Sequence, residues 1–471
     1  MNAAELQRLG VAAASQGRLE EALSCFERAC AAQPGNLAFM HNRAYALFHL
    51  GRLAEARAQA QAIVAIDPAN AGARDLLAKV LHEEGVAHHA AGRLPEAIEA
   101  YARAVGAGLA VPEALANYAN ALNGLGLVRR DEGRIDEAAA LFERSLALAP
   151  ISANAAHNLA LARLTAHRFS EGWSLYGARF RAVPPVSVWR DFPVPEFRAA
   201  DFGQGHRIAL WREQGIGDQV LFCAPLAALE ARGESFTLEC DARLAAPIRR
   251  AHPAWRVVTP GESAAAFAGC DRHAPIGSMA GLLRPTRESF REPWSALLAP
   301  DGERVARYRD ALAVPGRRIV GISWRSFQKA DRAALESSKS APLAAFGRLA
   351  ARSDLRLVDL QYGDTAAERG RFEGSLARIE GLDLFNDLDG VIAAIAACDA
   401  VVTTSSVTAH LAGASGKPTF LIYLRGVPPF HYWAPDEEER CLWYPSVRIV
   451  SGPGVDTWDR AVERVDELLD R

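Results

Sequence analysis

The spacing of hydrophobic and polar residues divides the chain into two regions of different period. Through residue 172, apolar residues recur at the three- and four-residue intervals of amphipathic helices. After Gly205, short β-branched runs alternate with helical stretches, which is typical of a mostly parallel sheet with helices on both faces. Between the two regions, residues 173–202 combine four prolines with large aromatic residues. Because proline excludes a regular helix, this segment is predicted to be an extended, packed linker.

A short phrase, Gly-Arg-Leu/Ile-x-Glu-Ala, recurs through the first region. Its copies stand at 17–22, 51–56, 92–97 and 133–138, with a degenerate copy at 167–172. The glutamates of these copies are 34, 41, 41 and 34 residues apart, which is the period of tetratricopeptide repeats with two seven-residue insertions. Three copies end at a proline that stops the second helix of the repeat (Pro34, Pro68 and Pro150). The segment resembles the tetratricopeptide-repeat family, so residues 1–172 are predicted to form an α-solenoid of about five stacked repeats.

Solenoids of stacked helix pairs present a concave surface, and the expected use of this one is to bind a protein partner. Asparagines lie where that surface would hold the backbone of a bound peptide, at Asn42, Asn117, Asn120 and Asn154 or Asn158. A spacer or a dimerisation arm is the alternative use of such a region. We find no catalytic constellation in this part of the sequence.

The second region is predicted to fold as two Rossmann-like halves, over residues 203–300 and 301–471. In the first half, strands are expected at 208–211, 236–240 and 256–258, with a helix at 218–232. In the second half, strands are expected at 319–323, 355–360 and 400–403 and again after Pro418, with helices at 342–351, 387–397 and 458–469. Ligands of paired halves bind between them, at the carboxyl ends of the strands.

Hydroxyl side chains gather after the strand at 400–403. Thr404, Ser405, Ser406 and Thr408 follow it within five positions, and His410 stands in the first turn of the next helix. Backbone N–H groups at a helix N-terminus and the positive end of the helix dipole favour an anion at such a position. The stretch therefore predicts a binding site for a phosphate. The alternative is that these hydroxyls only cap a helix of the core.

A glycine turn follows the first strand of the first half. It comprises Gln214, Gly215, Ile216 and Gly217, and Asp218 opens the helix after it. The third glycine of a dinucleotide fingerprint and the Gly-Lys-Ser/Thr of a Walker loop are both missing from the turn. Asp218 has two interpretations. It is a helix N-cap, or it is a carboxylate in the cleft that takes a proton from an acceptor hydroxyl.

Basic residues follow the strand at 319–323 of the second half. Arg325, Lys329, Arg332 and Lys339 fall within fifteen residues, among several serines. A solvated loop is the usual explanation of such a run. Because this strand belongs to the same predicted sheet as the strand at 400–403, the alternative is that these cations flank a bound diphosphate and neutralise a leaving phosphate.

Composition narrows the classes of function that remain. A chain of 471 residues with a net charge of −3 has no global electrostatic signature of a nucleic-acid binder. It contains no apolar run long enough to span a bilayer, and its first residues lack the order of a signal peptide. The seven cysteines are scattered without a Cys-x-x-Cys pair, which indicates neither a disulfide framework nor a zinc site. We therefore expect a soluble, cytoplasmic protein with no bound metal.

Several phrases together resemble the GT-B glycosyltransferases related to the ADP-heptose lipopolysaccharide heptosyltransferases. The matching phrases are Trp211-Arg-Glu-Gln-Gly-Ile-Gly-Asp218, Gly321-Ile-Ser-Trp324, Leu360-Gln-Tyr-Gly-Asp364, His410-Leu-Ala-Gly-Ala-Ser-Gly-Lys-Pro418 and Trp443-Tyr-Pro445. Their order makes the resemblance more specific than any one phrase, and it is strongest to bacterial proteins that fuse tetratricopeptide repeats to such a domain. The implied fold is an α-solenoid followed by a GT-B fold of two Rossmann-like domains, with the acceptor side at 203–300 and the nucleotide-sugar side at 301–471.

The resemblance also implies roles for individual residues. Asp218 takes the place of the family's base, with Gln214, Gly215 and Gly217 in its loop. The donor side would consist of Arg325, Lys339, Gln361, Ser405, Ser406, Thr408 and His410. The family commonly has an aspartate five residues before the histidine, in contact with the donor sugar, and Ser405 replaces it here. This difference predicts either a donor other than a heptose or a site that has lost activity.

The function that the resemblance implies is transfer of a sugar from a nucleotide-sugar donor to a hydroxyl acceptor, with inversion and without a metal. The nucleotide sugar is a substrate, and no cofactor is expected. The acceptor would be a protein recruited by the repeats, such as flagellin. Some relatives with this architecture modify flagellin with nonulosonic acids, so a CMP-linked donor is one candidate. Two alternatives remain: a non-catalytic scaffold that binds protein partners through its repeats, and an envelope-polysaccharide transferase that differs only in its acceptor.

Overall fold

The computed structural model describes residues 1–326, 339–424, 430–433, 435–452 and 454–470. By its internal contacts the chain forms two compact units. Unit 1 comprises Met1–Arg129 and Glu137–Ala155, and unit 2 comprises Arg130–Asp136 and Ala156–Arg471. The domain boundaries expected after residues 172, 202 and 300 stay predictions. Lys329 and Arg332 of the expected basic loop lie outside the described residues.

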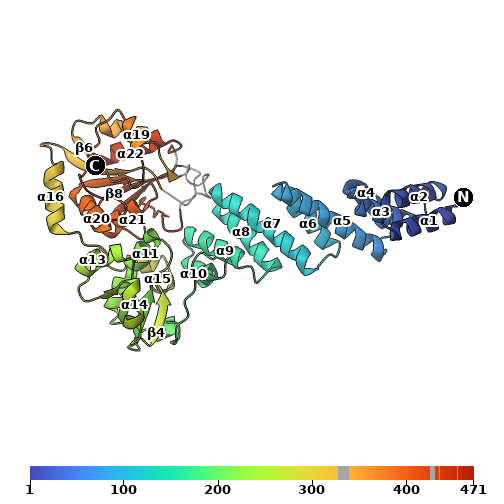
Figure 1. The fold of residues 1–471 in the computed structure, drawn as a ribbon, viewed down its shortest axis with the longest axis horizontal. Helices are drawn as coiled ribbons and strands as arrows, with labels where there is room; N and C mark the ends of the chain where they lie inside the picture. Colours follow the sequence, from blue (N-terminus) through green and yellow to red (C-terminus); the bar gives the residue numbers. More distant parts are fainter. Residues whose placement is uncertain (327–338, 425–429, 434, 453, 471) are drawn as a thin grey trace. The chain divides into compact units, whose positions relative to one another are not determined.

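Unit 1 consists of antiparallel helix pairs, each of which is one repeat (Figure 1). Its helices are α1 (Ala3–Ser15), α2 (Leu19–Ala32), α3 (Leu37–His49), α4 (Leu53–Ile66), α5 (Ala71–Ala90), α6 (Leu94–Gly106), α7 (Pro112–Asp131) and α8 (Ile135–Leu148). The glycine that opens each intact phrase adopts a left-handed backbone, with φ between 73° and 77° at Gly17, Gly51, Gly92 and Gly133. Glycine recurs there because this turn between the two helices requires a positive φ.

Three repeats bring a glycine of the first helix against an aromatic ring of the second helix, sixteen positions later. The pairs are Gly10 with Phe26, Gly85 with Tyr101 and Gly126 with Phe142. A methyl group on any of these glycines would lie 2.5 to 2.6 Å from a ring carbon. The missing side chain therefore allows the two helices of each repeat to pack closely around the ring.

Replacing Gly126 with alanine is expected to destabilise unit 1 by about 1–3 kcal/mol, because the new methyl group overlaps the Phe142 ring. Gly106→Ala is the matched control, since a methyl group at this helical glycine would meet no atom within 4 Å. It is expected to be neutral or stabilising by up to about 1 kcal/mol. Chemical denaturation followed by circular dichroism measures both variants. If Gly126→Ala were as stable as Gly106→Ala, helices α7 and α8 would be able to move apart around the new methyl group without a loss of stability.

Besides Arg130–Asp136, unit 2 contains most of the last repeat and both α/β halves. The repeat contains α9 (Ala153–Thr165), α10 (Phe169–Tyr176) and the 3₁₀ helix η1 (Gly177–Phe180). The first half contains β1 (Arg207–Trp211), α11 (Ile216–Cys223), η3 (Ala224–Leu226), α12 (Ala227–Ala231), β2 (Ser235–Glu239), α13 (Ala242–Ala251), β3 (Arg256–Val258), α14 (Pro260–Phe267), β4 (Arg272–Pro275) and α15 (Ile276–Leu283). Its strands form a parallel sheet in the order β3-β2-β1-β4.

The second α/β half contains a second parallel sheet, in the order β6-β5-β7-β8-β9. Its elements are α16 (Gly302–Leu312), β5 (Arg318–Ser323), η6 (Leu343–Phe346), α18 (Gly347–Ala350), β6 (Leu355–Asp359), α19 (Ala366–Gly370), α20 (Leu388–Ala397), β7 (Ala400–Thr403), α21 (Val407–Ala414), β8 (Thr419–Ile422), β9 (Val447–Val450) and α22 (Trp458–Leu469). The predicted fold class is confirmed: helical repeats precede two parallel-sheet α/β halves. None of the described helices is both long and apolar enough to cross a membrane.

Two expected elements differ in detail from the structure. The single helix predicted at 218–232 is instead α11, η3 and α12, because Pro225 has no N–H to continue the helical hydrogen bonds. The helix predicted at 342–351 is η6 followed by the one-turn helix α18. The strands β4 and β9 were not predicted. β4 carries Arg272, His273 and a terminal Pro275, which hide its strand character.

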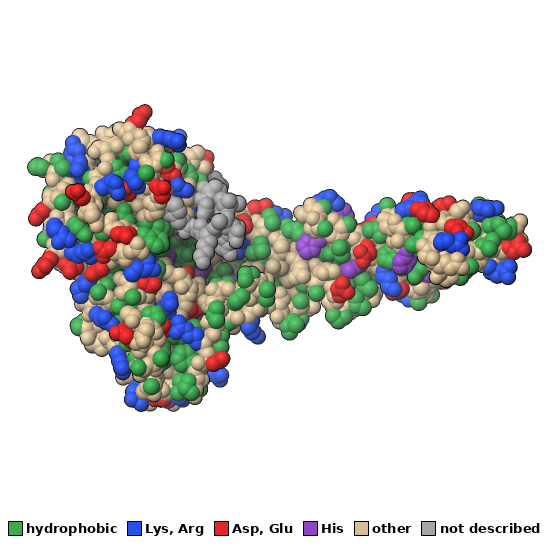
Figure 2. Space-filling model, viewed as in Figure 1, with side chains coloured by type: hydrophobic (Ala, Val, Ile, Leu, Met, Phe, Trp, Pro, Cys, Tyr) green, Lys and Arg blue, Asp and Glu red, His purple; other side chains and the backbone are tan. Residues whose placement is uncertain are grey.

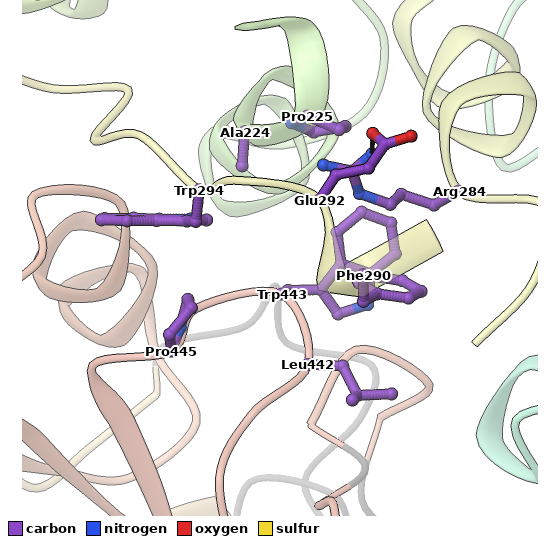
Figure 3. Close-up of a pocket in the computed structure, with 9 residues that line it drawn as sticks. All are labelled: Ala224, Pro225, Arg284, Phe290, Glu292, Trp294, Leu442, Trp443 and Pro445. Carbon is purple, nitrogen blue, oxygen red and sulfur yellow. Dashed lines mark hydrogen bonds and ion pairs between the residues drawn. The ribbon is translucent and has the colours of Figure 1, made fainter. Parts of the chain in front are cut away.

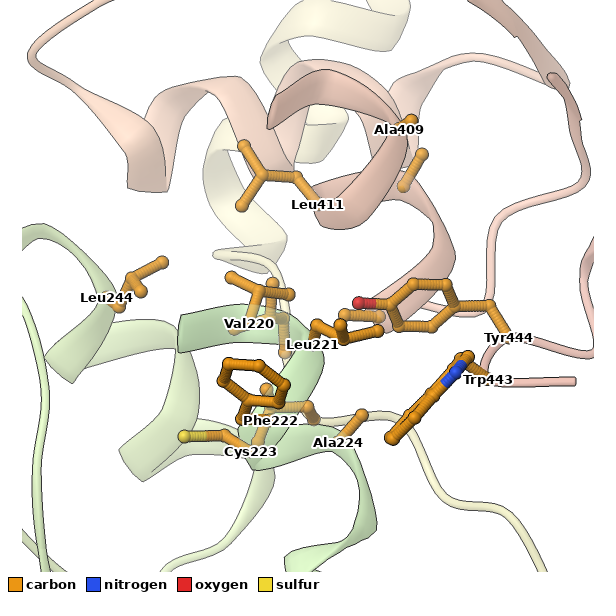
Figure 4. Close-up of a cluster of buried hydrophobic side chains, with 14 of the residues drawn as sticks. Val220, Leu221, Phe222, Cys223, Ala224, Leu244, Ala409, Leu411, Trp443 and Tyr444 are labelled. Carbon is orange, nitrogen blue, oxygen red and sulfur yellow. The ribbon is translucent and has the colours of Figure 1, made fainter. Parts of the chain in front are cut away.

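The two α/β halves share a hydrophobic core in which α11 packs against α21. Figure 4 shows Val220 and Leu221 of α11 facing the helix that carries Ala409, with Trp443 and Tyr444 beside them. All of these side chains are buried. This packing positions the first turn of α11, which contains Asp218, next to the first turn of α21.

Candidate functional site

Asp218 lies in the first turn of α11, directly after the loop that leaves β1. Its Oδ2 accepts the N–H of Gly215 at 3.2 Å, so the carboxylate caps its own helix, as one of the two interpretations expected. Burial raises the pKa of Asp218 to about 6, and the nearby Glu213 carboxylate adds to this rise. The Gly215 N–H and the Lys339 ammonium act in the opposite direction. A capping aspartate with a raised pKa is also a suitable proton acceptor near neutral pH.

His410 of α21 is the residue that meets the Asp218 loop across the two halves. A methyl group on Gly217 would lie 2.9 Å from His410 Cδ2 and 3.3 Å from its Nε2. The other ring nitrogen, Nδ1, is 3.1 Å from the Tyr444 hydroxyl. Burial lowers the pKa of His410 to about 3, with a further contribution from His431, so the imidazole is neutral. If Nδ1 accepts the Tyr444 proton, Nε2 is the N–H donor on the side of Gly217.

Ser405, the residue in place of the family aspartate, is held by an indole. Its Oγ accepts the Nε1–H of Trp433 at 3.0 Å, and both side chains are buried. The Trp433 ring also lies over His410, with 4.6 Å between the ring centroids. A carboxylate at position 405 would have the same indole donor within reach. The sequence provided no indication of this contact, because Trp433 belongs to none of the recognised phrases.

The hydroxyls before α21 do not cap it in the expected way. Ser406 is the N-cap residue, but its side chain makes no hydrogen bond to the helix amides and instead pairs with Thr403 Oγ1 at 3.1 Å. Thr404 is fully buried, and its Oγ1 has no hydrogen-bond partner among the described residues. Thr408 is buried in the first turn. The amides at this helix end are therefore not satisfied by the N-cap side chain, which favours the anion-site interpretation.

The described cations of the expected basic loop have acidic or aromatic neighbours. Arg325 pairs with Glu368, with 2.6 Å between Nη1 and Oε1. Lys339 is buried, with its Nζ 3.4 Å from the centre of the Phe430 ring. Its charge also acts on Asp218, as noted above. Lys339 is therefore a described cation whose charge lowers the pKa of the candidate base.

Gln361 holds the chain that leaves β5. Its Oε1 accepts the N–H groups of Trp324 and Arg325 at 2.8 and 2.7 Å and the hydroxyl of Ser323 at 3.1 Å. Its Nε2 donates to the carbonyls of Arg325 and Tyr362 at 3.1 and 2.8 Å. The amide is thus occupied by backbone and hydroxyl partners. The structure places Gln361 as a support of the chain after β5, and a direct contact with a donor stays a prediction.

The asparagines expected to contact a peptide lie on several repeats. Asn117 is half-buried and its Nδ2 is 3.2 Å from His82 Nε2, while Asn120 is exposed. Asn42 and Asn158 are half-buried. Their role in binding a peptide stays a prediction. Within the residues that the structure describes, no group of three His, Cys, Asp or Glu side chains is arranged to hold a metal ion.

A small pocket is lined by residues of both α/β halves (Figure 3). Phe290 and Trp443 line it, and Arg284, another lining residue, pairs with Glu292 at 2.6 Å. None of the predicted site residues lines it. On the face shown in Figure 2, basic and acidic side chains are interspersed over unit 2, so no large patch of one charge sign marks that face.

The raised pKa of Asp218 makes a prediction about stability. The folded state holds the proton more tightly than the unfolded chain, so this group's contribution to stability is present at low pH and is lost as the pH rises through about 6. Asp218→Asn is expected to stabilise the protein by about 1–3 kcal/mol at pH 8 and by much less at pH 4. Urea denaturation at both values measures this.

Asp241→Asn is the control with the opposite sign. The hydrogen bond from Arg243 lowers the pKa of Asp241, so the Asp241 carboxylate stabilises the fold most at high pH. Its replacement is expected to destabilise the protein more at pH 8 than at pH 4. If Asp218→Asn and Asp241→Asn changed stability with the same pH dependence, the burial of Asp218 would not perturb its titration.

Known proteins are similar to both regions of the chain. Residues 8–71 and 123–179 match the tetratricopeptide-repeat family. Protein FlbA of Caulobacter vibrioides is 31% identical over 439 aligned residues, which cover 80% of this chain and 70% of FlbA. The structure of ADP-heptose LPS heptosyltransferase II of E. coli is similar with a TM-score of 0.40 and 15% identity, over 56% of this chain and 98% of that one. A thermophilic tetratricopeptide-repeat protein of Thermus thermophilus gives a TM-score of 0.20 at 23% identity, over 39% and 92%.

The similarity to FlbA is the most extensive of these in sequence. Its coverage of 80% exceeds the length of the repeats alone or of the α/β halves alone, so it includes residues of both regions. An identity of 31% over such a length reflects common descent of the whole arrangement. The chain therefore belongs to the family of Protein FlbA from Caulobacter vibrioides.

Proposed function

We propose that the chain is a glycosyltransferase that moves a sugar from a nucleotide-sugar donor to a hydroxyl group of a protein acceptor. The observation that carries this proposal is the position of Asp218 beside the first turn of α21, through the contact between Gly217 and His410. A proton-accepting carboxylate and a helix terminus suited to an anion are thereby adjacent, on opposite α/β halves. Sugar transfer from a phosphate to an alcohol needs these two groups.

Asp218 has the properties of a general base for this reaction. With a pKa of about 6 it is mostly ionised at pH 7, yet it is more basic than an ordinary aspartate. Efficiency in proton transfer is greatest when the pKa lies near the working pH. Raising the pKa by burial therefore serves catalysis, although it costs stability at neutral pH.

The first turn of α21 would bind the donor phosphates. Three features support this. The N-cap hydroxyl of Ser406 makes no hydrogen bond to the helix amides, so these amides are not capped by that side chain. The buried Thr404 hydroxyl has no partner among the described residues, and Lys339 supplies a positive charge that acts on the site. Buried hydroxyls without a partner are uncommon, and a bound oxyanion would satisfy this one. His410 would add a neutral N–H donor, since its pKa of about 3 excludes the imidazolium.

In the proposed reaction, Asp218 accepts the proton of the acceptor hydroxyl as that oxygen bonds to the anomeric carbon of the sugar. The bond from the anomeric carbon to the phosphate oxygen breaks, and its electron pair leaves with the nucleotide. The amides of α21, His410 and Lys339 stabilise the charge on the departing phosphate. Because the acceptor oxygen attacks the anomeric carbon from the side of Asp218, opposite the departing phosphate, the configuration at that carbon is inverted. The chain's own groups supply the acid–base and charge-stabilising steps, and no metal is part of the proposal.

The tetratricopeptide repeats support a protein as the acceptor, because such repeats present extended surfaces to polypeptides. Flagellin is the acceptor that the sequence resemblance implies, and it is the first to test. The replacement of the family aspartate by Ser405, held by Trp433, supports a donor whose sugar differs from heptose. CMP-linked nonulosonic acids are one candidate.

Calorimetry with UDP-, ADP-, GDP- and CMP-sugars tests the proposal directly. We expect one nucleotide class to bind, and we expect the same sugar to add its mass to flagellin when both are incubated with the full chain. A chain that binds flagellin but none of these nucleotides would be a scaffold, and the proposal would fail. Transfer to a polysaccharide but not to any protein would retain the glycosyltransferase and reject the acceptor.

A further inference from the structure

A buried ion pair joins the last repeat to the loop that carries Asp218. Arg179, in η1 directly after the repeat helix α10, donates to Glu213 through both Nε and Nη2, at 2.8 and 2.7 Å. The exposed fractions of the two side chains are 0% and 1%. Glu213 also accepts the N–H of Gly277 at 2.9 Å, and Arg179 donates to the Ser278 hydroxyl at 3.1 Å. The pair is therefore bidentate and satisfied by further partners, which is the geometry that a buried ion pair requires.

The same repeat holds the next residue of the loop in an uncommon backbone conformation. Gln214 has φ of 59°, a left-handed value that non-glycine residues seldom adopt. Its side-chain Nε2 donates to the hydroxyl of Tyr176 at 3.0 Å. Glycine would fit this backbone without strain but would lose the hydrogen bond. The hydrogen bond to Tyr176 therefore offsets the strain of the left-handed backbone at Gln214 and holds this residue in place.

Tyr176 occupies a position that belongs to the repeat pattern. It follows Ala160 by sixteen residues, as Phe26, Tyr101 and Phe142 follow their glycines. In two earlier repeats this ring, Phe26 or Tyr101, lies in a hydrophobic cluster built from helices of the solenoid. In the last repeat the ring packs in the core of the α/β region, and its hydroxyl reaches Gln214. The ordinary packing residue of a repeat is therefore also part of the loop's support.

We propose that Tyr176 and Arg179 are positioning residues for Asp218, so that the acceptor half of the site is completed by the last tetratricopeptide repeat. This inference rests on the proposed function, in which Asp218 is the base. Tyr176 acts through Gln214 and Arg179 acts through Glu213, two residues of the loop that leads from β1 into α11, the helix whose first turn contains Asp218. The repeat region then does more than recruit an acceptor, because the last repeat positions Asp218, the group that accepts the acceptor's proton.

The charges of the ion pair also reach Asp218. The Glu213 carboxylate raises the pKa of Asp218, and Arg179 balances the charge of Glu213. Removing Arg179 leaves Glu213 unpaired, so the pKa of Asp218 is expected to rise. Removing the charge of Glu213 is expected to lower the pKa of Asp218. A purely structural disturbance would not produce shifts of opposite sign, so the two variants distinguish positioning from general loosening of the fold.

The experiment compares Tyr176→Phe, Glu213→Gln, Arg179→Met and the double variant Arg179→Met/Glu213→Gln in the full chain. Tyr176→Phe removes only a hydroxyl and is expected to lower kcat about tenfold without changing donor KM, because a small misplacement of a catalytic group is costly. The single-charge variants are expected to shift the acid limb of the pH–rate profile in opposite directions, by on the order of one unit. The double variant removes both buried charges and keeps the experiment informative if Arg179→Met does not fold.

Arg352→Met is the matched control. Arg352 pairs with Asp354, Asp466 and Asp470 in the second half, so its loss affects stability. It is expected to leave donor KM and the pH–rate profile unchanged per folded molecule. Wild-type kcat in Tyr176→Phe together with an unshifted profile in Glu213→Gln would overturn the proposal.

A readout without turnover separates this inference from the proposed function. In a chain labelled with ¹³C at aspartate carboxyls, the signal lost in Asp218→Asn identifies Asp218, and its titration can be followed in each variant. Opposite shifts of this titration support the positioning role even if Asp218 is not the base. An unchanged titration in Glu213→Gln contradicts that role, whatever Asp218→Asn does to sugar transfer.

Discussion

Asp218→Asn is expected to lower the rate of sugar transfer by about 10²–10⁴-fold, the range by which general-base catalysis accelerates such steps. Asparagine can still accept the N–H of Gly215, so the loop and α11 should keep their structure. Only the ability to take the acceptor's proton is lost. Donor affinity is expected to remain at the wild-type value, because the phosphate-binding turn belongs to the other α/β half.

Single-turnover transfer from the donor identified by calorimetry measures this effect, and the same variant's stability at pH 8 shows that it is folded. Asp241→Asn, in the same half, is the control and should retain nearly full activity. In the wild type, the rate should fall as the pH drops through about 6, where Asp218 takes up a proton. Full activity of Asp218→Asn would remove Asp218 from the mechanism and leave the base unassigned.

His410→Phe is expected to lower kcat by about 10²–10³-fold, the loss seen when one donor to a developing negative charge is removed. Phenylalanine keeps a ring of similar size between Trp433 and Gly217, but it supplies no N–H for the donor phosphate. It also leaves the Tyr444 hydroxyl without its partner, which costs about 1–3 kcal/mol of stability.

Tyr444→Phe is the control for the second effect. It removes the contact to Nδ1 while keeping the imidazole, so its transfer rate should fall far less than that of His410→Phe. Calorimetry with the donor and single-turnover rates are measured for both variants. If His410→Phe bound and turned over the donor normally, His410 would be a packing residue, and the anion site would consist of backbone amides, hydroxyls and Lys339.

The candidate site was predictable where a local pattern placed it. Asp218 follows a strand and a glycine turn, and Ser406 follows another strand, so both were expected at the carboxyl ends of parallel strands. The neighbours of these residues were not predictable in the same way. The contact of Gln361 with a donor stays a prediction. What the sequence did not indicate is that its amide supports the chain after β5, which follows because β5 and β6 are adjacent in the sheet.

The electrostatic state of the site also depended on tertiary contacts. His410 was expected to contribute an imidazole at a helix terminus, but enclosure by Trp433, Tyr432 and Tyr444 makes it neutral. This burial could not be predicted from the sequence around His410, because the three enclosing rings belong to a segment that follows β8. The pKa of Asp218 is raised for the same reason, by burial that only the packed halves create.

By itself, the sequence determined the repeats, the two sheets and the approximate position of the site. These depend on short-range periods of apolar residues, on glycine at left-handed turns and on strand ends, all of which are local. Only the tertiary structure decided which polar groups meet. Arg179 and Glu213 are 34 positions apart, and Ser405 and Trp433 are 28 apart. No period relates such residues, because their contacts arise from the packing of whole elements against one another.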